Sequence, residues 1–465
     1  MKIKINEIKG KKLSILFILL EIFLIFLIIK GYFLFSFGLL SILLLFPFTF
    51  LSIERTFYLL AGYILIFVLK EFLYNYPGLN IYYTQKIAFP IFLLIIFYFI
   101  LYLLLNPKKL KEIRFSSFDL AMLFFIGSIL ISSFIGLLKK HQEEYWRYEF
   151  IHFMYYLIYF VFVHSYIKEK SPIKFFDIIV FFICIGSLFD VYSLIARKTF
   201  FGFFRVFTQK VNMTVIALPY ILFSYIYPTP LKKRIVMSIG LFFVIISMFS
   251  SLQRALWVSG IITLLTWLPF LFYFHKKYIK IALTIFFSLF IGSLITIFII
   301  ERLTPGGFIE TVLWRMEIIF NPFLIFKDKS WIVRWGEIKD TLRPLLYKDL
   351  LLGAGVGAIT WSKWRFILKD TLDNSFAYLL WKAGIIGLIS FLIVIVIFFK
   401  RSIELFKVKE SEIKIISITA ILSYTGMIII SITNSGLLSY RFNLIWGAMF
   451  GIIEILYRKK IKKEN

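Results

Sequence analysis

Cysteine and histidine are scarce in this sequence. Its 465 residues include one cysteine, Cys184, which excludes an intramolecular disulfide. The four histidines show no metal-ligand spacing: His152 and His164 are twelve residues apart, and His141 and His275 stand alone. The sequence also lacks a nucleotide-binding loop, a Cys-x-x-Cys motif and the order of Ser, His and Asp residues typical of a catalytic triad. We therefore expect neither a metal ion nor a soluble cofactor.

Acidic residues are also few, because 26 Asp and Glu face 53 Lys and Arg and leave a formal net charge of +27. Such an excess often indicates nucleic-acid binding, but its distribution here is different. If the N-terminal segment is cytoplasmic, every second loop is basic, and these loops together hold 29 Lys and Arg. This is the positive-inside pattern of membrane proteins. The charge therefore reflects topology, and we expect no nucleic-acid partner.

Long apolar runs are abundant, and hydrophobic residues make up 60% of the chain. Many runs approach twenty residues, which is the length that crosses a bilayer as a helix. The sequence therefore predicts an all-α, polytopic integral membrane protein with about 12–14 transmembrane helices and both termini in the cytoplasm. The predicted spans are 13–30, 32–52, 57–74, 87–105, 118–138, 148–167, 175–196, 212–228, 235–250, 255–274, 281–300, 376–399, 412–433 and 438–457.

The predicted spans divide one membrane domain into three parts. Residues 1–300 form an N-terminal transmembrane bundle of about 11 spans, 301–375 form a long outer loop, and 376–465 form a C-terminal three-span segment. A loop of this length is usually functional when it is not disordered, and this one is rich in aromatic and aliphatic residues.

The long loop itself predicts two helices. An apolar piece at 308–326 is one of them, expected to lie at the membrane interface. The second helix is predicted from an apolar stripe, and we expect Pro344 to end this helix near Arg343. Residues of its apolar stripe recur at helical spacing: Trp331, Trp335, Ile338, Leu342 and Leu345.

Arginines recur on the predicted outer side of the membrane. Arg254, in SLQRALWVSG, opens a span, Arg205 lies in a loop between two spans, and Arg334 lies in the long loop. A guanidinium binds phosphate oxygens in a forked geometry, so these side chains suit a diphosphate. Interfacial arginines also reach toward lipid headgroups, and that alternative is open for each of them. Further outer arginines are Arg147, Arg315 and Arg343.

Two short motifs precede the span that starts near residue 376. GAGVGA places Gly353 and Gly355 in a turn that either presents N–H groups to a phosphate or re-enters the membrane. Asp373 and Asn374 are both good N-caps for the following helix. Capping needs only one of them, so the pair predicts either capping alone or capping together with a catalytic or acceptor-orienting role.

In order and spacing, these segments resemble the O-antigen ligase and O-antigen polymerase family of bacterial inner-membrane glycosyltransferases. SLQRALWVSG is similar to the family's Ser-Arg-Gly segment, with Arg254 on the arginine. RWGEIKDTLRPLLYKDLLLGAGVGA is similar to an Arg-rich helix followed by Pro-Leu-Leu-Gly-x-Gly, with Arg334 on the arginine and Gly353 and Gly355 on the glycines.

Two further segments extend the resemblance. DNSFAYLLWKAGIIGL is similar to the family's His-Asn segment, with Gly384 and then Gly387 following it. RVFTQKVNMTVIALPY is a fainter match that carries Arg205 and Asn212. The histidine typical of ligases is replaced by Asp373, and polymerases vary more at that point. The resemblance therefore favours a polymerase over a ligase.

The resemblance implies a GT-C-like bundle in the inner (cytoplasmic) membrane, with its long loop in the periplasm. The donor would be a polyprenyl-diphosphate-linked glycan, and the acceptor a glycan or a lipid core. Arg205, Arg254 and Arg334 would hold the diphosphate, and Asp373 and Asn374 would act with Arg254 in catalysis. The implied partners are the lipid bilayer and the two glycans, with room for a chain-length regulator or a flippase.

Two other classes of membrane protein compete with the glycosyltransferase interpretation. A lipid-linked oligosaccharide flippase has a similar number of spans, but it should show two pseudo-repeated halves and charges spread through a central cavity. Here the polar candidates gather on one side, and one long loop breaks any symmetry. A structural or regulatory membrane protein of envelope assembly is the third alternative, against which only the motif order argues.

Overall fold

Helices dominate the computed structural model, which describes residues 53–62, 64–65, 81–106, 114–164, 172–196, 212–226, 231–274, 287, 291–292, 298, 301–302, 308–434, 436–438 and 440–464. Within these ranges, four helices are long and apolar enough to cross a membrane. They are α4 (Ile81–Leu105), α6 (Ser117–Leu138), α16 (Ser375–Phe406) and α17 (Ser411–Thr433). The prediction of an all-α protein with membrane-spanning helices is confirmed at this level. The predicted spans 13–30 and 32–52 lie outside the described residues.

The other helices of the bundle follow the predicted apolar runs. The predicted span 148–167 is interrupted, because a short 3₁₀ turn divides it between α7 and α8. The bounds are α3 (Ile53–Gly62), α7 (Glu143–Met154), η2 (Tyr155–Leu157), α8 (Ile158–His164), α9 (Pro172–Ala196), α10 (Thr214–Ser224), α11 (Leu231–Ser250), α12 (Arg254–Phe274), η6 (Gly436–Leu438) and α18 (Tyr440–Glu464).

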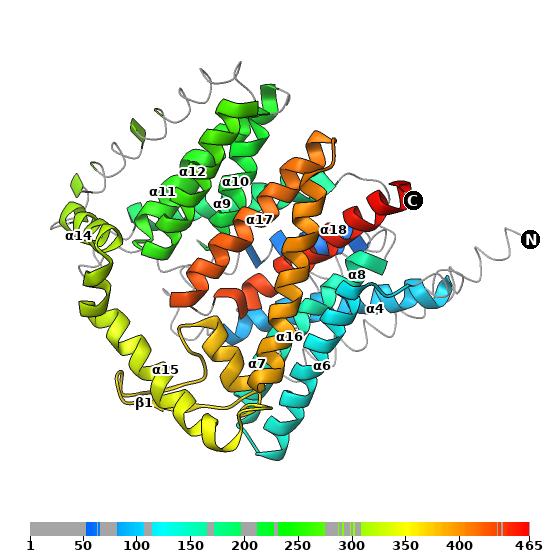
Figure 1. Ribbon diagram of the computed structural model, residues 1–465, viewed down its shortest axis with the longest axis vertical. Helices are drawn as coiled ribbons and strands as arrows, with labels where there is room; N and C mark the ends of the chain where they lie inside the picture. Colours follow the sequence, from blue (N-terminus) through cyan, green and yellow to red (C-terminus); the bar gives the residue numbers. More distant parts are fainter. Residues whose placement is uncertain are drawn as a thin grey trace, which may run out of the picture.

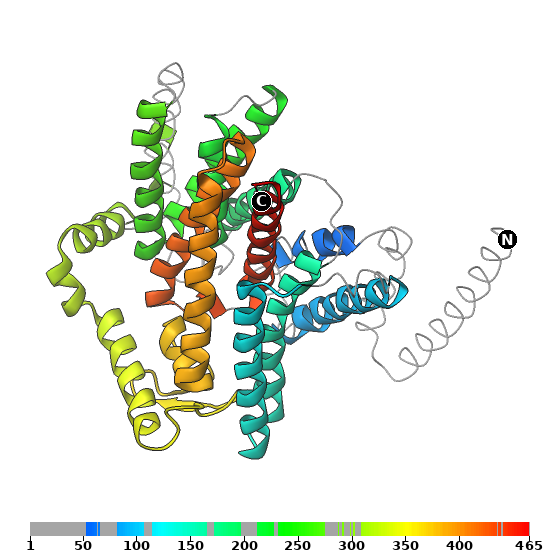
Figure 2. The same ribbon diagram turned by 45° about the vertical axis from the view of Figure 1, so that its right-hand side comes forward.

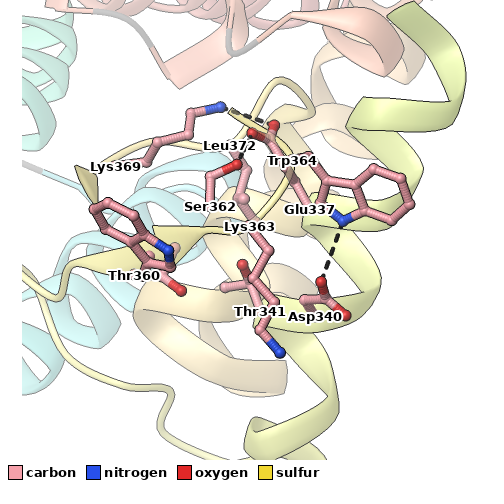
Figure 3. A pocket seen from close by; sticks show the side chains of 10 residues that line it. Glu337, Asp340, Thr341, Thr360, Ser362, Lys363, Trp364, Lys369 and Leu372 are labelled. Atoms are coloured by element: carbon pink, nitrogen blue, oxygen red, sulfur yellow. Dashed lines mark hydrogen bonds and ion pairs between the residues drawn. The ribbon is translucent and has the colours of Figure 1, made fainter. Parts of the chain in front are cut away.

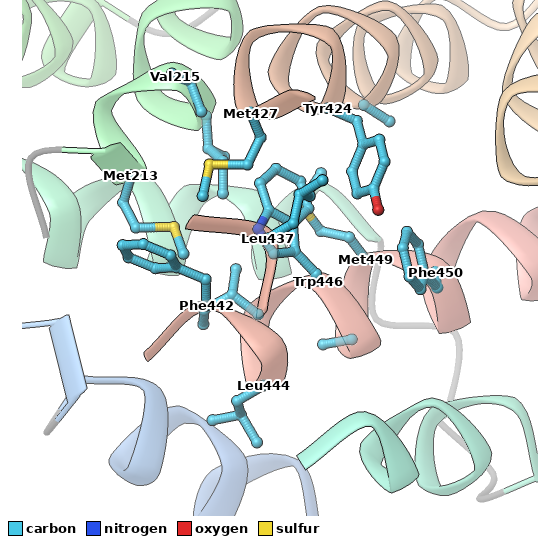
Figure 4. Close-up of a cluster of buried hydrophobic side chains, with 14 of the residues drawn as sticks. Met213, Val215, Tyr424, Met427, Leu437, Phe442, Leu444, Trp446, Met449 and Phe450 are labelled. Atoms are coloured by element: carbon cyan, nitrogen blue, oxygen red, sulfur yellow. The ribbon is translucent and has the colours of Figure 1, made fainter. Parts of the chain in front are cut away.

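Helix α18 lies at the centre of the hydrophobic core (Figure 4). All residues from 442 to 453 are buried, so this stretch of the helix is covered on every side. Trp446 is in edge-to-face contact with Tyr424 of α17, with ring centroids 5.0 Å apart. Around it, α18 packs against α7, α8 and α16. The last third of the chain therefore organises the bundle.

Two groups of helices surround α18 (Figures 1 and 2). In one, α6 packs along α16, and in the other, α10 and α12 pack along α17, with α9 and α11 beside them. Because α16 and α17 are consecutive, their antiparallel pairing connects the two groups.

Residues 308–372, which we call the arm, curve around one end of this bundle (Figures 1 and 2). The arm starts beside α12 and ends at the beginning of α16. It contains α14 (Phe308–Phe320), η5 (Pro322–Lys327), α15 (Lys329–Lys348) and the antiparallel strands β1 (Thr360–Ser362) and β2 (Ile367–Lys369). The arm is the segment that positions the candidate site.

The two helices predicted in the long loop exist, but the predicted end of the second is wrong. Helix α15 continues through Pro344 to Lys348. Proline removes only the hydrogen bond to the carbonyl of Asp340, and both residues are exposed, so water can bind that carbonyl. Of the predicted stripe, Ile338 and Leu345 are buried, and Ile338 packs into the hydrophobic core of the bundle.

Candidate functional site

Arg254 holds the first part of the site. It is the first residue of α12, and its Nη2 forms an ion pair with Asp328. Asp328 in turn caps α15, because its Oδ1 accepts a hydrogen bond from the N–H of Ser330 at 2.8 Å. Only 19% of the Arg254 side chain and 6% of the Asp328 side chain are exposed. The pair joins the beginning of α12 to the beginning of α15.

Arg315 brings a second guanidinium to the same place. It lies on α14, and its Nη1 donates to the backbone carbonyl of Leu252 at 2.7 Å, in the turn before Arg254. Burial lowers the pKa of Arg315, and the charges of Arg254 and Arg334 lower it further, whereas Asp328 acts in the opposite direction. Arg315 is therefore close enough to both Arg254 and Arg334 to be repelled by them, and Asp328 offsets part of that repulsion.

Arg334 of α15 supplies the third guanidinium, and we call Arg254, Arg315 and Arg334 the arginine triad. Each keeps a buried nitrogen with no hydrogen-bond partner among the described residues: Nη1 of Arg254, Nε of Arg315 and Nε of Arg334. A buried donor left unpaired costs about 1–3 kcal/mol, and more when it is charged. Three cationic side chains whose buried donors lack hydrogen bonds, one of them with an ion pair to Asp373, form a site suited to an anion.

Asp373 connects the arginine triad to a second group of charges. Its Oδ2 lies 3.4 Å from Nε of Arg334 and 2.5 Å from Nη2 of Arg365. Arg365 and Lys369 also bind Glu337 of α15, at 3.1 and 2.9 Å. Burial alone would raise the pKa of Asp373, but Lys369, Arg365 and Arg334 together hold it below its usual value. A carboxylate stabilised in this way is a weak base, and its position suits the orientation of Arg334.

Asn374, and not Asp373, caps α16. Its Oδ1 accepts a hydrogen bond from the N–H of Ala377 at 2.9 Å. Its Nδ2 donates to the carbonyl of Ile432 at 3.0 Å, near the end of α17. Asp373 and Asn374, which the sequence analysis treated as a pair of possible N-caps, therefore have separate structural roles. Asn374 fixes the start of α16 to α17, and Asp373 holds cations.

The Gly-rich segment lies against a break in α16. At Gly384 the backbone has φ of 66°, so the helix is interrupted there. The N–H groups of Ala354 and Gly355 donate to the carbonyls of Trp381 and Lys382, at 2.7 and 3.0 Å. These bonds satisfy carbonyls that the break leaves without helical partners. The N–H of Gly355 is thus used within the protein, which favours the re-entrant alternative over phosphate binding.

Two of the predicted glycines, Gly353 and Gly384, are required by this close approach of two backbones. A Cβ on Gly384 would collide with the carbonyl of Leu351, and a Cβ on Gly353 would collide with the carbonyl of Lys382. Both glycines also have positive φ, which other residues adopt at a cost. Gly387 lies one turn after the break, where a Cβ would meet Ala383 of the same helix.

A buried ion pair lies directly beneath the Gly-rich segment. Nζ of Lys382 is 2.6 Å from Oε1 of Glu149 on α7, and both side chains are almost fully buried. Nζ also donates to the carbonyl of Ala358, and Oε2 of Glu149 accepts from the N–H of Gly357 at 2.6 Å. The Nζ lies 4.0 Å from the ring centroid of Trp381 as well. The pair therefore fastens the Gly-rich segment to α7 and α16 at once.

A small pocket lies between α15 and the β1–β2 hairpin (Figure 3). One of its lining residues, Leu372, directly precedes Asp373 in the sequence. Leu372 and Glu337 line the pocket, together with Trp364, whose Nε1 donates to Oδ2 of Asp340 at 3.2 Å. The Trp364 ring lies so close to Gly336 that a Cβ there would collide with it. The pocket thus presents an aromatic ring beside carboxylate and hydroxyl groups.

The structure brings together some of the predicted arginines and separates others. Arg254 and Arg334 lie in the triad with Arg315, whereas Arg147 is exposed and pairs with Glu143 on α7. Arg343 is exposed on α15. Arg205 lies outside the described residues.

Several residues of the site were not predicted from the sequence. Asp328 and Arg365 look like ordinary loop charges, and nothing in their spacing marks them. Lys382 carried a usable signal, because a lysine within a predicted span is a functional or structural candidate by default. Its partner Glu149 is 233 residues away in the chain, so no local pattern could pair them.

No protein-family model matches the sequence, and no curated protein is significantly similar to it.

Proposed function

We propose that this protein is a membrane glycosyltransferase that moves a glycan from a polyprenyl-diphosphate donor to a sugar hydroxyl, with a polysaccharide polymerase favoured over a ligase. The observation that carries the proposal is the arginine triad, in which Nη1 of Arg254 and Nε of Arg315 are buried without a hydrogen-bond partner among the described residues and Nε of Arg334 has only its ion pair with Asp373. The motif resemblance supports it, since Arg254 and Arg334 of the triad are the arginines that the resemblance selected. The proposed location is a bacterial inner membrane, with the arm on the periplasmic side.

The triad would bind the diphosphate of the donor. It lies where α12, α14 and α15 meet at one end of the bundle, which is where the phosphates of a lipid anchored between the helices would emerge. Guanidinium groups match phosphate oxygens in geometry and stabilise the charge that builds on the leaving group.

In the proposed reaction, the oxygen of the acceptor hydroxyl forms a bond to the anomeric carbon of the donor. The bond from that carbon to the diphosphate oxygen breaks, its electron pair stays on the diphosphate, and the hydroxyl proton passes to water. Asp373 would not serve as the base, since three cations lower its pKa. It would instead keep Arg334 directed at the diphosphate and accept a hydrogen bond from the acceptor.

The exposed surface around the pocket beside the hairpin, with Trp364 at its edge, would contact part of the acceptor. Trp364 is 44% exposed, so its indole offers a flat apolar surface to the C–H face of a sugar ring. Asp340 and Thr341 offer hydrogen-bonding groups in the same pocket. Leu372 lines the pocket and Asp373 follows it, so a bound sugar would extend toward the triad.

The test is transfer in vitro by the purified chain in lipid, supplied with a polyprenyl-diphosphate-linked repeat unit. Wild-type protein should convert the donor alone into a ladder of longer lipid-linked glycans, and Arg254→Ala should abolish the ladder. Arg147→Ala is the matched control, because it removes an exposed arginine whose only described partner is Glu143. Product only after addition of a separate acceptor would mean a ligase. No product from a matched native donor would refute the glycosyltransferase proposal and favour a transporter.

A further inference from the structure

Asp328 is a surprising neighbour for an anion site. Its carboxylate is almost completely buried, forms an ion pair with Arg254 and lies close enough to Arg315 to favour the charged form of that arginine. A negative charge at this place attracts the same guanidinium groups as a phosphate would. It therefore opposes the binding of any anion to the triad.

The two oxygens of Asp328 have different tasks. Oδ1 accepts the N–H of Ser330 and so caps α15, whereas Oδ2 pairs with Nη2 of Arg254. Capping alone does not need a charge, because asparagine is as good an N-cap as aspartate. The negative charge is thus explained by the arginines and not by the helix.

The arginines need a counter-charge when no ligand is bound. Arg254 and Arg334 disfavour the charged form of Arg315, and Asp328 is the acidic group that favours it. Hydrogen bonds with Ser330 and Arg254 hold the pKa of Asp328 below its usual value against the effect of burial, so it stays ionised. Asp328 on Arg254, together with Asp373 on Arg334, thereby allows three guanidiniums to be packed where α12, α14 and α15 meet.

We propose that Asp328 is a built-in counter-anion of the arginine triad, which replaces the ligand's charge in the empty site and weakens the binding of a diphosphate in the occupied one. The inference rests on the proposed function of the triad as a diphosphate site. It adds a residue that sets affinity and product release and that touches no reacting atom. Asp328 is therefore a positioning residue in this scheme.

The chemistry of the reaction gives this counter-anion a purpose. The donor diphosphate is esterified at both ends, whereas the released lipid diphosphate has a free terminal phosphate that ionises further near neutral pH. The product is therefore the more negative of the two and is bound more strongly by three arginines. Repulsion from Asp328 acts most on that product and so favours its release.

The experiment measures binding of inorganic diphosphate to the full chain in zwitterionic lipid nanodiscs at low ionic strength. Asp328→Asn keeps the cap and removes the charge, and it should bind diphosphate roughly tenfold more tightly than wild type. The gain should shrink as salt is added, because salt screens the repulsion. Asp349→Asn is the matched control, since it removes a charge from the other end of α15, about 30 Å away. Its affinity should equal that of wild type, and thermal melting should show that both variants fold.

Three results have distinct meanings. Tighter binding by Asp328→Asn alone supports the counter-anion. Equal binding by wild type and Asp328→Asn overturns the counter-anion and leaves the proposed diphosphate site standing. No binding by either protein, with melting curves that show both folded, overturns the triad as a diphosphate site and the inference with it.

Discussion

The buried pair of Lys382 and Glu149 allows the sharpest test of how the site is supported. We expect Glu149→Gln to destabilise the protein strongly, because it leaves the Lys382 ammonium without a counter-charge in a fully buried position. Removing one partner of such a pair costs about 3–5 kcal/mol. This is a large fraction of the 5–15 kcal/mol that stabilises a typical protein.

A double variant separates the ion pair from the hydrogen bonds around it. In Glu149→Gln/Lys382→Met, the amide oxygen still accepts the N–H of Gly357, and no charge remains buried. We therefore expect the double variant to lose about 1–2 kcal/mol, less than either single variant, because isosteric replacement of a buried pair is often close to neutral. The coupling between the two positions should then exceed about 3 kcal/mol.

The assay is denaturant unfolding in mixed micelles, followed by tryptophan fluorescence. The exposed pair Glu143–Arg147 on α7 provides the control, with side chains 75% and 64% exposed. Glu143→Gln and Arg147→Met should each change the free energy of unfolding by at most about 1 kcal/mol. If Glu149→Gln and Lys382→Met behave like these exposed variants, the buried pair does not hold the Gly-rich segment, and our account of that segment is wrong.

Three further predictions concern the break in α16, the pocket and Asp373. Gly384→Ala should lower the unfolding free energy by more than about 1 kcal/mol, measured in the same assay, because the new Cβ strikes the Leu351 carbonyl at a positive φ. Trp364→Ala should raise KM for the acceptor and leave donor affinity unchanged in transfer assays; an unchanged acceptor KM would exclude the pocket from acceptor binding. The ion pairs of Asp373 should stabilise the fold above about pH 4 and be lost as pH falls through its lowered pKa. Wild type should therefore lose more stability than Asp373→Asn during acid titration, and parallel titration curves would contradict this.

The apolar helices around the site could be predicted from the sequence, because helix formation depends on residues close together in the chain. Apolar runs near bilayer length located α4, α6, α16 and α17, since helix formation and burial depend on neighbouring residues. Gly384, at the break in α16, was singled out only through the family resemblance, since no local pattern shows that a helix is interrupted there. Local pattern also misled, because Pro344 was expected to end a helix whose exposed face tolerates it.

The sequence alone determined that this protein is helical, that its longest apolar helices can cross a membrane, and that arginines cluster between its predicted spans. Only the tertiary structure decided that Arg254, Arg315 and Arg334 meet, and that Arg147 does not join them. It also paired Glu149 with Lys382 and Asp328 with Arg254 of the triad. The physical reason is the sequence separation of the interacting residues. Helix formation depends on residues that are neighbours in the sequence, whereas these ion pairs depend on how distant segments pack together.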